Sequence, residues 1–218
     1  MVDDGGSRSG VVIASVRHRH YRGAFFTSVA VRPEPPARST PMDFPIGLEV
    51  HDSVVPDPGG VIELIANHPQ WQISPVGKSP TTSETRTSSS LFLPFLSFAN
   101  PPVLHEFARS VWSVMTDYAR RFSVPITSFE PISFNRYEPG QEFHVHADYF
   151  EGSNRVISAV AYLNTVEEGG MTNFIYYGVE VEAVAARVAV FPSNFLFAHA
   201  ALPPQAGIKY SAAFWARG

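Results

Sequence analysis

Residues 142–148 read Glu-Phe-His-Val-His-Ala-Asp, and this stretch places three possible metal ligands on alternate positions. A β-strand directs residues i, i+2 and i+4 to one face of a sheet, so His144, His146 and Asp148 are expected to face the same point. A His-x-His pair and a His-x-Asp pair lead to different metal sites and therefore to different chemistry.

The sequence around this stretch consists of short β-like runs separated by turns. Turn signals such as Glu-Pro-Gly-Gln, Glu-Gly-Ser-Asn and Glu-Glu-Gly-Gly separate several of the runs. After Pro125 there are eight runs, at residues 128–138, 142–150, 155–164, 172–177, 179–184, 187–192, 195–201 and 209–216. Eight short strands after two helices predict a mainly β fold, a jelly roll or barrel with helices packed on one side.

Two helices are expected before these strands. Residues 57–69 predict a short helix closed by a proline, and residues 101–125 predict a longer one with prolines at its start. Apolar residues recur at helical spacing in the second helix and predict a stripe packed on a sheet: Leu104, Phe107, Val111, Val114, Tyr118 and Phe122. We therefore expect one domain at 46–218, with helical support at about 46–124 and a jelly-roll core at about 125–218.

Two segments lack such patterning. Residues 1–45 are rich in Gly, Ser, Arg and Pro, which predicts a flexible or loosely packed N-terminal arm. Its His-Arg-His sequence at 18–20 is interpreted as part of this arm rather than as a metal pair. Residues 74–90 are polar and without periodicity, which predicts a surface loop able to act as a lid.

The composition describes a folded protein. Of the 218 residues, 44% are apolar and 17 are phenylalanine, which argues against disorder. The net charge of -4 gives no sign of a nucleic-acid-binding surface, and the absence of cysteine excludes thiolate catalysis and disulfides. The apolar run at 11–16 is too short to span a bilayer. We expect a cytoplasmic protein with no membrane or nucleic-acid partner, and the oligomeric state stays open.

Two sets of metal ligands are compatible with the opening stretch. A cupin-type site would use His144 and His146 with His199 and a glutamate, Glu180 or Glu182. The second set, His146, Asp148 and His199, is the facial triad of non-haem Fe(II) oxygenases. Three protein ligands leave three open positions, two for a chelating 2-oxo acid and one for dioxygen.

The position of Lys209 favours one of these two sets of metal ligands over the other. Only two lysines occur in the chain, and Lys209 lies in the apolar segment Gly-Ile-Lys-Tyr-Ser-Ala-Ala-Phe-Trp, ten residues after His199. A buried lysine is costly unless it meets an anion, and the far carboxylate of 2-oxoglutarate would be that anion. A cupin-type site without this cosubstrate has no use for Lys209, so the facial triad is favoured.

From about Leu48 onward the chain resembles the prolyl 4-hydroxylase-like branch of the Fe(II)/2-oxoglutarate-dependent dioxygenase superfamily. The ordered motifs are Arg-Thr-Ser at 86–88, Tyr-x-x-Gly-Gln at 137–141, His-x-Asp-Tyr-Phe at 146–150, an Arg-led strand ending in Tyr-Leu at 155–163, Glu-Glu-Gly-Gly-x-Thr-x-Phe at 167–174, and His199, Lys209 and Trp215. Three departures occur: Phe143 stands where the family usually has tyrosine, His144 is unusual, and the loop between Asp148 and Arg155 is short. All three fall on the substrate side.

The resemblance implies a double-stranded β-helix, the jelly-roll, cupin-like core of this family, supported by N-terminal helices. It implies Fe(II) at His146, Asp148 and His199. It also implies 2-oxoglutarate held by Lys209 with hydrogen bonds from Thr172 and Tyr137. Candidate residues on the substrate side are Arg155, Arg86, Glu130, His144 and Trp215.

The implied activity is hydroxylation of an unactivated C–H bond in a proline or prolyl-type substrate, with dioxygen consumed and succinate and CO2 released. Ascorbate is an expected stimulant. The alternative is a natural-product tailoring oxygenase that hydroxylates, desaturates or cyclises a small molecule or free amino acid. Nucleic-acid dealkylation fits less well, because Lys209 and the net charge of -4 both speak against it.

Overall fold

In the computed structural model of the chain, residues 44–74, 85–93 and 100–218 are described. The predicted N-terminal arm lies outside these ranges except for its last two residues, and so does the His-Arg-His sequence at 18–20. Within the described ranges, no helix is long and apolar enough to cross a membrane.

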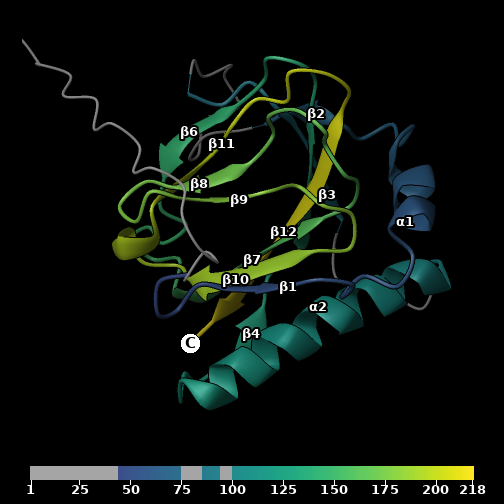
Figure 1. Ribbon diagram of the computed structural model, residues 1–218. Coiled ribbons are helices and arrows are strands. Elements are labelled where there is room, and N and C mark those ends of the chain that lie inside the picture. The colour runs from purple at the N-terminus through teal and green to yellow at the C-terminus, as the bar shows by residue number, and fades with distance from the viewer. Residues whose placement is uncertain (1–43, 75–84, 94–99) are drawn as a thin grey trace, which may run out of the picture. The chain divides into compact units, whose positions relative to one another are not determined.

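The strands form two antiparallel sheets that face each other (Figure 1). The major sheet contains β1 (Glu49–His51), β2 (Gln72–Ile73), β3 (Ser89–Leu93), β4 (Ser128–Phe129), β5 (Ile132–Tyr137), β7 (Arg155–Tyr162), β10 (Val188–Pro192) and β12 (Lys209–Arg217). The minor sheet contains β6 (Phe143–His146), β8 (Thr172–Phe174), β9 (Val179–Val181) and β11 (His199–Ala201). The strand orders are β1-β10-β7-β12-β5-β3-β2, with β4 paired to β12, and β6-β11-β8-β9. From β5 to β12 the chain passes back and forth between the sheets, which confirms the predicted double-stranded β-helix.

Alternation along the central strands divides their side chains between two environments. On β12, four alternate residues line a cavity between the sheets: Lys209, Ser211, Ala213 and Trp215. The residues that alternate with them belong to the other face, where Ala212, Phe214 and Ala216 are in the apolar core and Tyr210 packs against it. Strand β5 repeats the pattern, since Asn135 and Tyr137 line the cavity while Ile132 and Phe134 are in the core.

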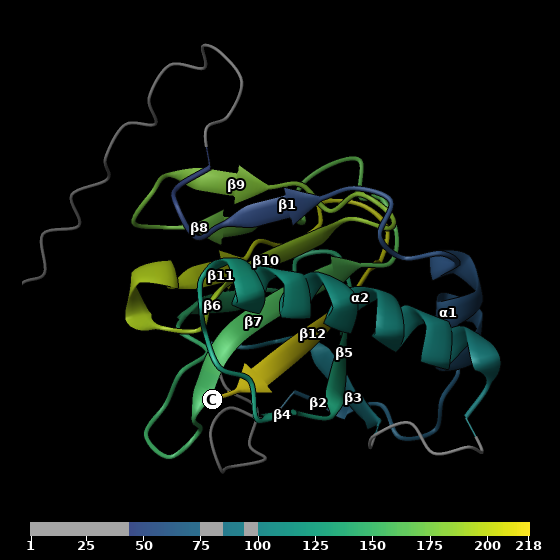
Figure 2. The ribbon, with the colours of Figure 1, turned by 90° about the horizontal axis from the view of Figure 1, so that it is seen from below.

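Two helices complete that core. Helix α2 (Pro102–Arg121) runs across the outer face of the major sheet, and α1 (Pro58–Ile65) packs beside it (Figure 2). The side chain of Asp57 caps α1 by accepting a hydrogen bond of 2.9 Å from the Gly60 N–H. From α2, the Phe107 ring lies 5.8 Å from Phe134 and 5.4 Å from Phe214, ring centroid to ring centroid. The predicted stripe is correct except at Phe122, which follows the last helical residue and is exposed; Val114 is half-buried and packs against the core.

The region before residue 125 differs from the prediction in two ways. It is not only helical, because β1, β2 and β3 extend the major sheet at both edges. The surface loop predicted at 74–90 is wrong at both ends that the structure describes, because Ser74, Ser88 and Ser90 are fully buried and β3 begins at Ser89. The Ser74 hydroxyl lies 2.9 Å from that of Ser88 and 2.6 Å from that of Ser90, so the polar groups satisfy one another. Residues 75–84 of that loop lie outside the described ranges.

Candidate active site

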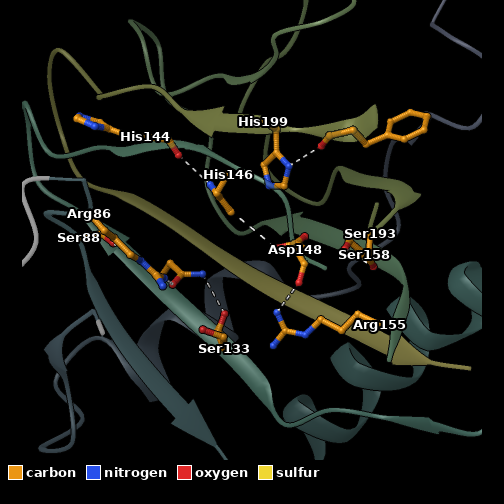
Figure 3. Close-up of polar contacts among 12 residues, drawn as sticks. Arg86, Ser88, Ser133, His144, His146, Asp148, Arg155, Ser158, Ser193 and His199 are labelled. Atoms are coloured by element: carbon orange, nitrogen blue, oxygen red, sulfur yellow. Dashed lines mark hydrogen bonds and ion pairs between the residues drawn. The ribbon is translucent and has the colours of Figure 1, made fainter. Parts of the chain in front are cut away.

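Three ligand-type side chains converge on the inner face of the minor sheet (Figure 3). His146 ends β6 and pairs directly with His199, the first residue of β11, while Asp148 follows β6 by two residues. The candidate ligand atoms of all three lie within 4.8 Å of one another. This is the metal-competent group among the described residues, and neither His144 nor the glutamates of the cupin-type alternative belong to it.

The two imidazoles present the same nitrogen to the site. His146 Nδ1 lies 2.8 Å from the His144 carbonyl oxygen, and His199 Nδ1 lies 2.9 Å from the Phe197 carbonyl oxygen. A carbonyl oxygen only accepts, so each Nδ1 carries a proton and each neutral ring keeps its lone pair on Nε2. His146 Nε2 lies 3.8 Å from Asp148 Oδ1, as expected for two metal-binding atoms directed at one common metal position.

The charge states suit metal binding. Burial, with a smaller contribution from His199, lowers the pKa of His146 to about 4, so this imidazole is neutral near pH 7. Burial alone would raise the pKa of Asp148, but the two imidazoles and a hydrogen bond from the Ser158 hydroxyl outweigh burial and hold it below its usual value. Two imidazole nitrogens and one carboxylate are a donor set that divalent first-row metals accept.

A bulge in β6 changes what lies beside His146. Three residue steps from Phe143 to His146 oppose two steps from Ala201 to His199 on β11, so strict alternation fails. The Phe143 ring therefore stacks on His146, with 3.6 Å between ring centroids, and the Arg86 guanidinium lies 4.4 Å from the centre of the Phe143 ring. The expectation that His144 shares the face of His146 is wrong: its side chain points away from the site and contacts Glu142 at 3.1 Å (Figure 3).

Lys209 lies in the same cavity as the three ligands. It is 1% exposed, and its Nζ donates a 2.6 Å hydrogen bond to the Gly170 carbonyl. Its Nζ also lies 5.2 Å and 5.5 Å from the ring centres of Tyr137 and Tyr162. Burial lowers the pKa of Lys209 to about 7, and within the described ranges no carboxylate offsets that effect.

Hydroxyl groups accompany this lysine. Tyr162 donates a 2.7 Å hydrogen bond to Thr172 Oγ1, which leaves the proton of Thr172 free to point into the cavity. Burial raises the pKa values of Tyr137 and Tyr162, so both phenols stay protonated at neutral pH. The sequence analysis missed Tyr162, although alternation from Ser158 would have placed it on the inner face of β7.

The predicted substrate-side residues divide into two groups. Arg86 and Trp215 line the cavity, and Arg86 is held there by hydrogen bonds of 2.7 Å to Asn135 Oδ1 and 3.1 Å to Ser90 Oγ. Arg155 and Glu130 do not line it but pair with each other at 2.6 Å. The cavity thus offers a two-nitrogen, one-carboxylate donor set in one part and a buried ammonium with hydroxyl groups in another. That combination fits a divalent metal together with a dicarboxylic acid.

Known proteins with similar sequences agree with a site for a divalent metal and a dicarboxylic acid. A sequence model described as the 2OG-Fe(II) oxygenase superfamily matches residues 132–217, from the start of β5 to the end of β12. The chain is 30% identical over 138 residues to Prolyl 4-hydroxylase 1 of Arabidopsis thaliana, covering 58% of this chain and 46% of that protein. It is 33% identical over 109 residues to Probable prolyl 4-hydroxylase 10 of the same plant, covering 45% and 32%. The chain therefore spans less than half the length of these curated relatives.

Solved structures share the fold. A Pseudomonas putida prolyl-4-hydroxylase superposes with a TM-score of 0.65 at 21% identity, covering 79% of this chain and 93% of that one. A Trichoplax adhaerens prolyl hydroxylase, in complex with a peptide fragment of hypoxia inducible factor, superposes with a TM-score of 0.69 at 14% identity, covering 78% and 83%. A viral collagen prolyl hydroxylase from Paramecium Bursaria Chlorella virus-1, solved with 2OG, gives 0.61 at 19% identity, covering 78% and 96%.

Proposed function

We propose that the chain is a member of the 2OG-Fe(II) oxygenase superfamily, in its prolyl 4-hydroxylase-like branch, and that it hydroxylates an unactivated C–H bond of a proline or prolyl-type substrate. The observation that carries this proposal is the placement of His146, Asp148 and His199 in one cavity with Lys209. A metal-dependent oxygenase with a dicarboxylate cosubstrate requires both a metal-binding donor set and a cation for the far carboxylate.

The residues of the chain have separate tasks in this reaction. His146, Asp148 and His199 would hold Fe(II), and Lys209 with Thr172 and Tyr137 would hold the far carboxylate of 2-oxoglutarate. When bound, Fe(II) and 2-oxoglutarate supply dioxygen activation, so that one oxygen atom enters the substrate C–H bond and the other enters succinate, with CO2 released. The backbone carbonyls of His144 and Phe197 fix the imidazole orientation.

We favour a polypeptide substrate over a free amino acid or a natural-product intermediate, because exposed aromatic residues lie on three loops, one directly after Asp148, one shortly before His199 and one between β8 and β9. The Tyr149 N–H bonds to the Ser193 carbonyl at 2.8 Å, and the Ile175 N–H bonds to the Ala198 carbonyl at 3.3 Å, so the loops adjoin one another. More than a third of each of these side chains is exposed: Tyr149, Phe150, Tyr176, Tyr177 and Phe195. Aromatic surfaces of this kind suit extended, proline-containing chains.

Succinate release tests the activity. His146→Ala and Asp148→Ala should each abolish substrate-dependent succinate formation, whereas His144→Ala, which removes an outward-pointing side chain from the same strand, should retain it. Lys209→Ala should chiefly raise the concentration of 2-oxoglutarate required. Unchanged turnover in both ligand variants would refute the assignment. A panel of proline-containing peptides and free amino acids, scored by the same assay, separates the polypeptide substrate from the small-molecule alternative.

We further propose that the protein acts in the cytoplasm, that ascorbate stimulates it, and that it has no nucleic-acid partner. The net charge of -4 supports the last point, because a nucleic-acid-binding face is expected to be basic. Electrophoretic mobility of labelled single-stranded DNA and RNA at low salt provides the check, and a salt-sensitive shift would contradict it.

A further inference from the structure

Asp148 is not fixed by its own strand. Strand β6 ends at His146, so the backbone of Asp148 is held by groups from other elements. The Arg155 Nη1 donates a 3.2 Å hydrogen bond to the Asp148 carbonyl oxygen (Figure 3), and the Ser158 hydroxyl bonds to its carboxyl group. Ser158 Oγ is in turn 2.8 Å from Ser193 Oγ. These contacts reach Asp148 from the side of the major sheet.

Arg155 is itself oriented by a carboxylate and an aromatic ring. Its Nε and Nη2 donate to the two oxygens of Glu130 at 3.0 Å and 2.6 Å, a bidentate pair. Its guanidinium lies 3.8 Å from the centre of the Trp215 ring. Because the guanidinium is planar, these two contacts determine where Nη1 points, and it points at the backbone of Asp148.

Glu130 is anchored from a second side. Arg217 donates a 2.9 Å hydrogen bond to Glu130 Oε1 from β12, and Glu130 is 8% exposed. Burial alone would raise the pKa of Glu130, but its hydrogen bonds to Arg155 and Arg217 prevail, so the pKa is lowered and the carboxylate stays charged. Arg155 and Arg217 therefore share one buried anion, but of these two arginines it is Arg155 that donates a hydrogen bond to Asp148.

We propose that Arg155 is a positioning residue for the metal ligand Asp148, with Glu130 as its anchor, and that it does not contact the substrate. The inference rests on the metal site proposed above. It follows from the direction of Nη1 and from the position of Arg155 outside the residues that line the cavity. Outer partners of this kind commonly change metal affinity 10–100-fold when they are removed.

Arg155→Lys tests the proposal, with Arg217→Lys as the matched control. Both changes keep a positive charge next to Glu130, but only the first removes the donor to the Asp148 carbonyl. Mn(II) binding, measured by the EPR signal of the free ion without 2-oxoglutarate or substrate, should weaken about 10-fold or more in Arg155→Lys and change less than about 3-fold in Arg217→Lys. At saturating metal, the KM for substrate should remain near the wild-type value in both.

Three outcomes would overturn the proposal. They are unchanged Mn(II) affinity in Arg155→Lys, equal weakening in Arg217→Lys, or a raised substrate KM with intact metal binding. Glu130→Gln gives an independent measurement if Arg155→Lys does not fold, since the loss of the anchor should weaken Mn(II) binding in the same direction, and wild-type affinity there would count against the role. Failure of the proposed function is distinguishable, because the wild-type protein would then take up no Mn(II).

Discussion

Replacing Lys209 by methionine should make the protein more stable while it loses its response to 2-oxoglutarate. The Lys209 ammonium is buried, its one hydrogen bond goes to the Gly170 carbonyl, and burial lowers its pKa from 10.5 to about 7. Binding sites often contain such groups, which are unfavourable in the free protein and are compensated only by the ligand.

The magnitude follows from the pKa. Each tenfold change in the proton dissociation constant corresponds to about 1.4 kcal/mol. Below pH 7 the charged Lys209 therefore lowers the free energy of unfolding by roughly 5 kcal/mol, as an upper estimate. The unfolded chain keeps the ordinary pKa and binds more protons than the folded protein between pH 7 and pH 10.5. The destabilisation is therefore complete below pH 7 and is relieved as the pH rises, to about 2 kcal/mol at pH 9.

Replacing Lys209 by methionine removes this destabilisation, but the variant also loses a stabilising hydrogen bond. The Gly170 carbonyl loses its hydrogen bond in Lys209→Met, which costs about 1–3 kcal/mol. We expect a net stabilisation of about 2–4 kcal/mol at pH 6 and near zero at pH 9. Lys209→Gln, which keeps a donor for Gly170 without the charge, separates the two contributions.

Urea denaturation of the metal-free protein at pH 6 and pH 9 measures the effect. With Mn(II) present in parallel samples, added 2-oxoglutarate should stabilise the wild type and should not stabilise Lys209→Met. A variant less stable than the wild type at pH 6, or a difference that does not depend on pH, would refute the argument that Lys209 is a strained, desolvated cation.

Three further predictions concern the surroundings of the cavity. Gly169→Ala should lower the free energy of unfolding by about 2 kcal/mol or more, because φ is +76° and a Cβ would come within 2.4 Å of the Pro203 carbonyl oxygen. Gly178 has φ +61° with open space around it, so Gly178→Ala should cost only about 1 kcal/mol in the same urea titration. Tyr162→Phe should weaken 2-oxoglutarate binding several-fold by calorimetry, because Thr172 loses the donor that orients it, and unaltered affinity would exclude this relay. Phe143→Leu should weaken Mn(II) binding through loss of the stack on His146, whereas Phe143→Tyr should preserve it; equal affinities in both variants would show that the stack is irrelevant.

The parts of the site that lie on regular strands follow from the sequence. Lys209 and Trp215 are six residues apart on β12, an even number of steps, so both face the cavity, and the same period places Asn135 with Tyr137 on β5. Ser211 and Tyr162 follow from the same rule and could have been predicted. Helix α2 was predictable for a similar reason, because its apolar stripe repeats at the helical period over five turns.

The parts that were missed depend on tertiary hydrogen bonding. Ser88 and Ser90 resemble surface residues in the sequence, yet they are buried because Arg86, Asn135 and Ser74 satisfy their hydroxyl groups. A polar segment buried by partners distant in the chain has no local signature. The bulge in β6 is similar, since its existence depends on the register of β11, more than fifty residues later.

That bulge also explains why the substrate is harder to infer than the cosubstrate. The residues proposed to hold 2-oxoglutarate lie within paired strands, and the directions of their side chains are set by the register among β5, β7 and β12. The residues nearest the substrate side of His146 are Phe143, which the bulge turns inward, and Arg86, which joins β6 through a single bridge to Phe143. Where the resemblance led us to expect a tyrosine, this chain presents the Phe143 ring, which has no hydroxyl and contacts the His146 imidazole and the Arg86 guanidinium. A substrate placed there would be oriented by shape and by Arg86 rather than by a phenol.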